Sequence, residues 1–204
     1  MQMAWNENRI ILTGTVSGEA VLSHQNHGVT YVRFPLRVRR LSGAEDVLNV
    51  VAARSLLEQC PVRPGETLAV EGEVRSYNNR SGTGSKLVIT VYARIMEPDS
   101  GPHRNDLTLA GVLCKPPVLR RTPLGREICD MMLAVNRRYG RADYLPCIAW
   151  GGLAAWCSRL NVGDGLKLTG RLQSRDYVKE LEGRTEQRTA FEISVMSLEP
   201  TREE

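Results

Sequence analysis

The sequence predicts an all-β protein built from two copies of one small domain, and two observations carry this prediction. The first is an internal repeat: the segment from Asn8 to Gly14 recurs from Asn105 to Gly111. The second is the strict alternation of apolar and polar residues in segments such as 166–172, LKLTGRL, which is typical of a half-buried strand. The 204 residues therefore divide into two domains of about 100 residues each.

The repeat continues in order along the chain, and its offset grows slightly through small insertions. Further matched pairs are Phe34 with Met131, Asp46 with Asp143, Gly65 with Gly163 and Pro98 with Pro200. An ordered series of this kind is not expected by accident. We therefore predict one domain over residues 1–98, a linker over 99–104 and a second domain over 105–200.

Each copy is predicted to hold five short strands with a short helix between the third and the fourth. The helix of the second copy covers 153–160, where apolar residues at helical spacing place Trp156 in the core. A weaker equivalent covers 55–60 in the first copy. This arrangement is typical of the OB-fold, a small Greek-key barrel that binds oligonucleotides or oligosaccharides. The predicted fold class is thus all-β, with two tandem five-stranded OB-fold barrels.

Composition and motifs exclude several classes of protein. No apolar run is long enough to span a membrane, no secretory signal is visible, and the five widely spaced cysteines include no CxxC pair, so a reducing cytoplasm is expected. Motifs for catalysis, nucleotide binding and metal binding are missing from the sequence. We therefore expect no enzyme activity, no catalytic residues, no metal site and no cofactor.

Arginine and aromatic residues alternate in the second copy. Arg137, Arg138 and Arg141 surround Tyr139. Arg171 and Arg175 precede Tyr177. Aromatic rings that stack on bases, combined with guanidinium groups that grip phosphates, are the usual means of binding single-stranded nucleic acid.

Tyr144 and Trp150 lie six residues apart, so within one unbroken strand they face the same side. Pro146 between them predicts an edge strand or a bend, because proline has no N–H for a ladder hydrogen bond. A flat face with two rings suits base stacking.

The second copy resembles the bacterial single-stranded DNA-binding protein family over nearly its whole length. The matching segments are NDLTLAG (105–111), LAVNRR (133–138), ADYLPCIAWG (142–151), VGDGLKLTGRLQSRDY (162–177) and EISV (192–195). The first copy is similar more loosely, through NRIILTG, PLRVRR and KLVITVYARI. The resemblance implies the barrel fold, binding of single-stranded DNA without strong sequence preference, and four barrels in the assembly. With two barrels per chain, it implies a homodimer.

The resemblance also implies four positions at which aromatic rings stack on bases. In the second copy these are Tyr139, Tyr144, Trp150 and Tyr177. The corresponding residues of the first copy are Ser42, Val47, Ala53 and Tyr77. Only Tyr77 keeps a ring, so we expect a degenerate stacking surface in the first barrel and the main DNA-binding surface in the second.

In the strand predicted around 31–39, the even-numbered residues Phe34, Leu36 and Val38 are expected to face the core. The odd-numbered residues are then expected to point outward; they include Tyr31, Arg33, Arg37 and Arg39. They hold phosphates, form a subunit contact, or are simply solvated. We include Arg37 and Arg39 among the candidate phosphate contacts.

The leading hypothesis is single-stranded DNA binding in replication, recombination or repair, by a protein associated with the nucleoid. Two alternatives stay open: a primosome-like protein–protein adaptor with weak nucleic-acid binding, and RNA binding on the same surface. The chain ends in Arg202-Glu203-Glu204, which does not resemble the acidic tail common in the family, so recruitment of replication enzymes by such a tail is not expected.

Overall fold

The fold is described from a computed structural model, which describes residues 7–79, 85–137, 140–181 and 183–201. The chain forms two compact units. The N-terminal unit comprises Arg9–Arg75 and Ile89–Leu107. The C-terminal unit comprises Met1–Asn8, Ser76–Val88 and Thr108–Glu204. Residues 76–79 and 85–88, which belong to the first copy of the repeat in sequence, are thus part of the C-terminal unit.

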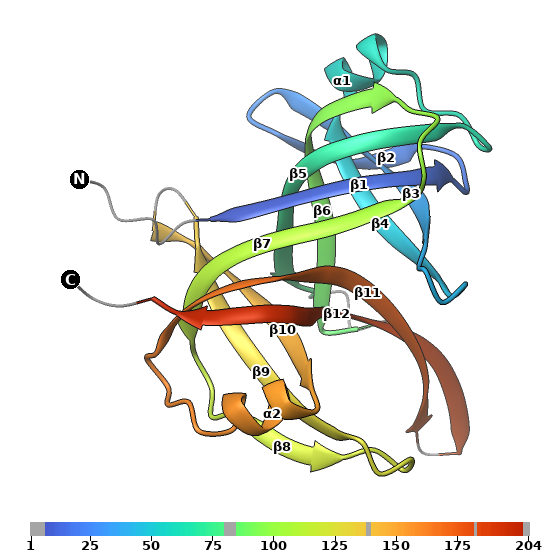
Figure 1. The fold of residues 1–204 in the computed structure, drawn as a ribbon. Coiled ribbons are helices and arrows are strands. Elements are labelled where there is room, and N and C mark those ends of the chain that lie inside the picture. Colours follow the sequence, from blue (N-terminus) through green and yellow to red (C-terminus); the bar gives the residue numbers. More distant parts are fainter. Residues whose placement is uncertain (1–6, 80–84, 138–139, 182, 202–204) are drawn as a thin grey trace. The chain divides into compact units, whose positions relative to one another are not determined.

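The first copy of the repeat forms six strands and one helix (Figure 1). They are β1 (Asn8–Val16), β2 (Val21–Asn26), β3 (Val29–Arg39), β4 (Glu45–Ala53), α1 (Arg54–Gln59), β5 (Thr67–Asn78) and β6 (Leu87–Pro98). Their order in the sheet is β2-β3-β4-β6-β5-β1, and β1 pairs in turn with β3, so the sheet closes on itself. The pairing of β4 with β6 is parallel.

The second copy repeats this plan (Figure 1). Its elements are β7 (Arg104–Leu113), β8 (Val118–Arg121), β9 (Glu127–Asn136), β10 (Ala142–Trp150), α2 (Gly152–Cys157), β11 (Gly165–Leu181) and β12 (Arg184–Pro200). Their order is β7-β11-β12-β10-β9-β8, closed by pairing of β7 with β9. The same order in both copies confirms the all-β class and the tandem OB-fold barrels, each with a helix at the expected place.

Each copy has one short strand more than the five expected, β2 in the first and β8 in the second. Both pair only at an edge of their sheet, with β3 and β9 respectively. The β2–β3 turn consists of His27 and Gly28, both with positive φ (47° and 77°), as two-residue hairpin turns require. Most residues from Ser23 to Gly28 are polar, so the sequence shows no alternation of apolar and polar residues that would predict β2.

Alternate residues of the strands build the core of each unit. Phe34, Leu36 and Val38 are fully buried, as their parity predicts. Four of the five cysteines are buried as small apolar side chains, and the fifth, Cys114, is half-buried. Burial raises the pKa of the Cys157 thiol to about 12, so this thiol stays protonated at neutral pH.

The expectation that Trp156 belongs to the core is wrong. Helix α2 has only six residues and buries Ala154 and Cys157. Trp156 lies off that short apolar stripe and is 38% exposed. The prediction assumed a longer helix over 153–160, with a wider apolar face than α2 has.

In the part of the chain that the structure describes, no helix is both long enough and apolar enough to cross a membrane.

Candidate nucleic-acid interface

Strand β10 presents two aromatic rings on its outer face. Its odd-numbered residues from Asp143 to Ala149 are buried, whereas Tyr144 is 51% exposed and Trp150 is 39% exposed. The two rings therefore share one face, as their spacing predicts. Since β10 pairs with β9 along its whole length, the strand that carries them is held firmly on that side.

Pro146 lies where the second pairing of β10 begins. The parallel register with β12 covers Cys147 and Ile148, directly after the proline. A residue without an N–H fits this position, because no ladder bond on that side is lost. Strand β10 nevertheless lies between β12 and β9, so it is not the edge strand that Pro146 was expected to indicate.

A buried ion pair holds the start of β10. Arg137 donates from Nε to Oδ2 of Asp143 at 2.5 Å and from Nη2 to the Ser76 carbonyl at 2.9 Å. Asp143 is fully buried and also accepts the Ser76 N–H at 2.5 Å. These contacts favour a structural role for Arg137 in place of the predicted phosphate contact, because its guanidinium is already bound to a carboxylate and a carbonyl.

The same ion pair recurs in the N-terminal unit. Arg40 donates from Nε to Oδ2 of Asp46 at 2.7 Å, and Asp46 is fully buried. The match of Asp46 with Asp143 in the repeat thus has a physical reason: each carboxylate binds the arginine six residues before it.

The end of β5 contributes to the C-terminal unit beside β10. The Ser76 hydroxyl accepts the backbone N–H of Tyr144 at 2.7 Å. The next residue, Tyr77, is an exposed ring. The predicted stacking residue of the first copy therefore adjoins the main predicted surface of the second.

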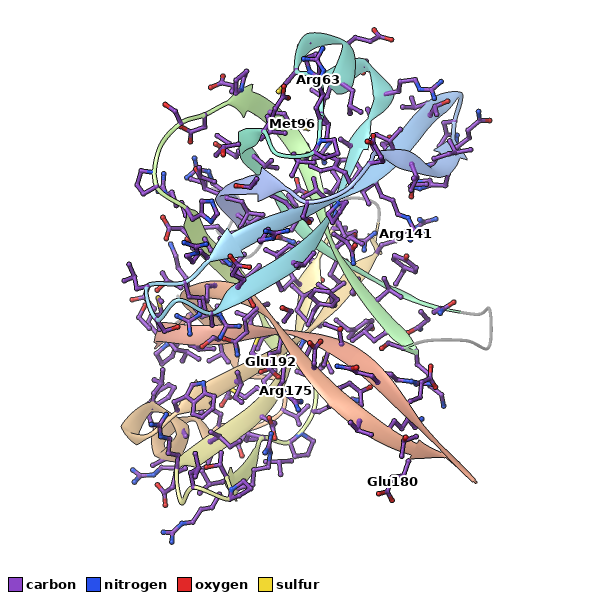
Figure 2. All side chains as sticks on the ribbon, turned by 90° about the vertical axis from the view of Figure 1, so that its right-hand side faces the viewer. Arg63, Met96, Arg141, Arg175, Glu180 and Glu192 are labelled. Carbon is purple, nitrogen blue, oxygen red and sulfur yellow. The ribbon has the colours of Figure 1, made fainter. Side chains whose placement is uncertain are left out.

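Tyr177 lies on the long β11–β12 hairpin between two arginines. The Cζ atom of Arg175 lies 5.8 Å from the centroid of its ring. Arg188 is its partner across the hairpin. Arg175 Nε lies 3.8 Å from Glu192 Oε1. Figure 2 shows these two side chains next to each other, and Glu180 near the tip of the hairpin. Arg175 and the Tyr177 ring thus form a small basic and aromatic surface, whereas the Arg188 side chain is only 15% exposed and donates from Nη2 to Glu186 Oε2 at 2.8 Å.

The remaining predicted site residues of the C-terminal unit are arginines and one tyrosine. Arg141 is exposed, and Arg171 is half-buried with its Nε donating to Gln173 Oε1 at 3.4 Å. Arg138 and Tyr139 lie outside the described residues. Among the described residues, no group of three or more His, Cys, Asp or Glu side chains is arranged to hold a metal ion.

Comparison with known proteins identifies the family. Residues 104–200 match the model of the single-strand binding protein family. A single-stranded DNA-binding protein of Thermus thermophilus is 31% identical over 215 residues, which cover 94% of this chain and 76% of the relative. The chain belongs to the single-strand binding protein family.

Two further matches show how far the similarity of this family member extends. Single-stranded DNA-binding protein A of Bacillus subtilis is 34% identical over 103 residues, covering 47% of this chain and 60% of the relative. A crystal structure of a deletion mutant of the single-stranded DNA binding protein from Thermus aquaticus superposes with a TM-score of 0.78 at 27% identity. That superposition covers 99% of this chain and 98% of the other, so both barrels are matched.

The N-terminal unit of this family member carries an aromatic cluster that sequence reasoning only partly found. The rings of His24 and Tyr31 are stacked, with centroids 4.7 Å apart and an interplanar angle of 11°. The Tyr92 hydroxyl donates to the Tyr31 hydroxyl at 3.1 Å, and Arg94 lies 4.7 Å above the Tyr92 ring. Burial, followed by the hydrogen bond with Tyr31, raises the pKa of Tyr92 to about 12. The outward parity of Tyr31 was the one available signal, whereas β2, which carries His24, was not predicted.

A basic cavity lies in the same unit. It has a volume of about 420 Å³, and its lining residues include Arg37, Arg39, Arg40, Glu45 and His103. Glu45 pairs with Arg39 at 3.1 Å and with Arg37 at 3.8 Å. His103 is fixed by accepting the Arg39 N–H on Nδ1 at 2.7 Å. One carboxylate thus faces two exposed guanidinium groups, which leaves a net positive charge at this cavity.

Proposed function

We propose that this protein binds single-stranded DNA without strong sequence preference, in replication, recombination or repair. The observation that carries the proposal is the pair of exposed rings, Tyr144 and Trp150, on one face of β10 in a chain of the single-strand binding protein family. Every base has a π-face, so such rings bind bases of any sequence, and each stack contributes about 1–3 kcal/mol.

The second barrel supplies the main surface in this proposal. Tyr144 and Trp150 stack on bases, and Tyr177 and Tyr77 extend the row of rings. The phosphates are held by the exposed arginines Arg141 and Arg175 and by the half-buried Arg171. Tyr139 and Arg138 complete the set by family resemblance. The barrel over 105–200 is thus the primary binding domain, the barrel over 1–98 has the weaker stacking surface, and 99–104 links them.

Three further properties belong to the same proposal. The protein is a homodimer that brings four barrels together, it acts as a binding protein and catalyses no reaction, and it associates with nucleoid DNA in the cytoplasm. Each of these is supported by family membership, and the first by the presence of two barrels in one chain.

The test is a titration of the full chain with dT oligomers, followed by intrinsic tryptophan fluorescence, with the particle mass measured in parallel. Stacking on Trp150 should quench its emission, and the Trp156→Phe variant should keep this quenching, since Trp156 lies on α2. The logarithm of the binding constant should fall linearly with the logarithm of salt concentration, by about 0.7 per phosphate contacted. Unchanged fluorescence and mobility with poly-dT at low salt would refute the proposal.

A matched pair of RNA and DNA oligomers separates the two nucleic acids. The described surface offers stacking rings and guanidinium groups, neither of which requires or excludes a 2′-hydroxyl. Tighter binding of oligo-U than of oligo-dT would replace DNA by RNA as the ligand.

A further inference from the structure

The first barrel has an aromatic ring next to the position that is equivalent to Trp150, but on β3 instead of β4. Trp150 pairs across β9–β10 with Ile128, and Ala53, its counterpart in the repeat, pairs across β3–β4 with Tyr31. The repeat offset of 97 that matches 53 with 150 also matches 31 with 128. The two pairs are therefore equivalent, and the aromatic member stands on opposite strands in the two barrels.

Directly paired residues share one face of a sheet, with Cβ atoms about 4.5–5.5 Å apart. A ring on β3 thus covers nearly the same patch as a ring on β4 would. The third strand of the row, β2, adds His24, which pairs with Tyr31 and stacks on it at 4.7 Å. His24 is exposed, so the outer ring of this stack is open to solvent.

The stack is held in place on the side away from His24, by a residue of β6. Tyr31 is bound through its hydroxyl to Tyr92, and the guanidinium of Arg94 covers the Tyr92 ring. A ring that is already oriented loses little conformational freedom when a base stacks on its partner. Two nearly parallel rings therefore form a platform that a base extends at the His24 end.

Cations follow the platform along the same strand. Arg33, Arg37 and Arg39 share the outward parity of Tyr31, and all three are exposed. The equivalent positions of β9 hold Asp130, Ala134 and Asn136, none of which is basic. In the first barrel, rings and cations are thus combined on β3, whereas in the second the rings are on β10. At the far end of this stripe lies the cavity of about 420 Å³ that Arg37 and Arg39 line.

We propose that the outer face of β2 and β3 is a second single-stranded DNA-binding surface, with the His24–Tyr31 stack as its base platform and Arg33, Arg37 and Arg39 as its phosphate contacts. This inference rests on the proposed function. It replaces the expectation of a degenerate first barrel by a surface moved one strand across the sheet.

The test compares Tyr31→Leu, which keeps an apolar side chain without a ring, with Tyr31→Phe, which keeps the ring and loses only the hydroxyl. Each is titrated with a dT oligomer of about 8 nucleotides, which one barrel can hold, and one of about 35, which reaches both. Tyr31→Leu should weaken binding of the long oligomer about fivefold or more, the loss of one base stack. Binding of the short oligomer, which occupies the second barrel, should change less than about twofold. Tyr31→Phe should match the wild type on both.

His24→Ala is a second variant that does not endanger folding, because the side chain is exposed. It should weaken the long oligomer selectively as well. Equal affinities of Tyr31→Leu and Tyr31→Phe for the long oligomer, with wild-type binding intact, would overturn the inference and leave the proposed function standing. A changed particle mass of Tyr31→Leu would assign this face to a subunit contact and overturn it too. Failure of the wild type to bind any dT oligomer would refute the proposed function itself.

Discussion

The substitution Asp143→Asn tests whether the buried ion pair supports the C-terminal unit. Asp143 is 0% exposed and accepts hydrogen bonds from Arg137 Nε and from Ser76 N–H, each at 2.5 Å, as well as from Arg137 Nη2. An asparagine removes the charge that compensates the guanidinium. Whichever way the asparagine amide is turned, its NH₂ group faces a hydrogen-bond donor: Arg137 Nε in one orientation, and Arg137 Nη2 with the Ser76 N–H in the other.

The expected loss in the free energy of unfolding is about 2–4 kcal/mol. Breaking a fully buried pair costs about 3–5 kcal/mol, but the Arg137 side chain is 25% exposed, so water compensates part of its charge. The control is Asp130→Asn, because Asp130 pairs with Arg120 on the surface, where both side chains are at least 40% exposed. Exposed pairs contribute about 1 kcal/mol or less.

The assay is urea unfolding followed by tryptophan fluorescence. Trp150 and Trp156 both belong to the C-terminal unit, so their emission reports on unfolding there. The midpoint of Asp143→Asn should fall by about 1–2 M relative to the wild type, and that of Asp130→Asn by much less. If both variants unfold at the same midpoint, the ion pair does not have the structural role that we assign to it.

Three further predictions address the site, the packing and the pH dependence. Trp150→Ala should weaken oligo-dT binding about 5- to 150-fold, as expected for one lost base stack, whereas Trp156→Ala should leave it within about twofold in the same fluorescence-anisotropy assay. Gly170→Ala should cost about 1–3 kcal/mol in thermal or urea unfolding, because its Cβ would collide with the Ser194 carbonyl, while Gly152→Ala meets open space and should cost nothing. Because the pKa of Tyr92 is about 12 in the folded state, above the usual value near 10, the stability that neutral Tyr92 contributes is complete below about pH 10 and is lost as the pH rises towards 12. Tyr92→Phe should flatten this decline in urea unfolding followed by circular dichroism, and an unchanged profile would exclude Tyr92 as its cause.

The sequence predicts the barrels well because their pattern is local. Alternation along one strand decides which residues are buried, and the ordered repeat shows that both halves use the same plan. The helix was harder, since six residues form fewer than two turns and the position of Trp156 depends on where those turns begin. The short edge strands β2 and β8 were missed because polar residues leave no periodic signal, even though Gly28 permits the turn between β2 and β3.

The candidate site divides in the same way. Tyr144 and Trp150 were predictable, because a spacing of six within one strand places both on one face. The Arg137–Asp143 pair was not, because Arg137 directly follows β9 and Asp143 lies on β10, so the two side chains meet only once these strands pair. Charge pattern alone assigned Arg137 to phosphate, whereas its carboxylate partner is visible only in the fold.

The position of Tyr31 opposite Ala53 makes one last variant informative. The double substitution Tyr31→Ile with Ala53→Trp gives the first barrel the same residue pair that Ile128 and Trp150 form in the second. Ala53 has extended backbone (φ −63°, ψ 140°), which a tryptophan adopts without strain. If the ring's place on the face matters and its strand does not, this variant should regain the long-oligomer affinity that Tyr31→Leu loses, to within about threefold of the wild type. A double variant as weak as Tyr31→Leu would show that the first barrel needs its ring on β3, next to His24, and that the two strands are not interchangeable.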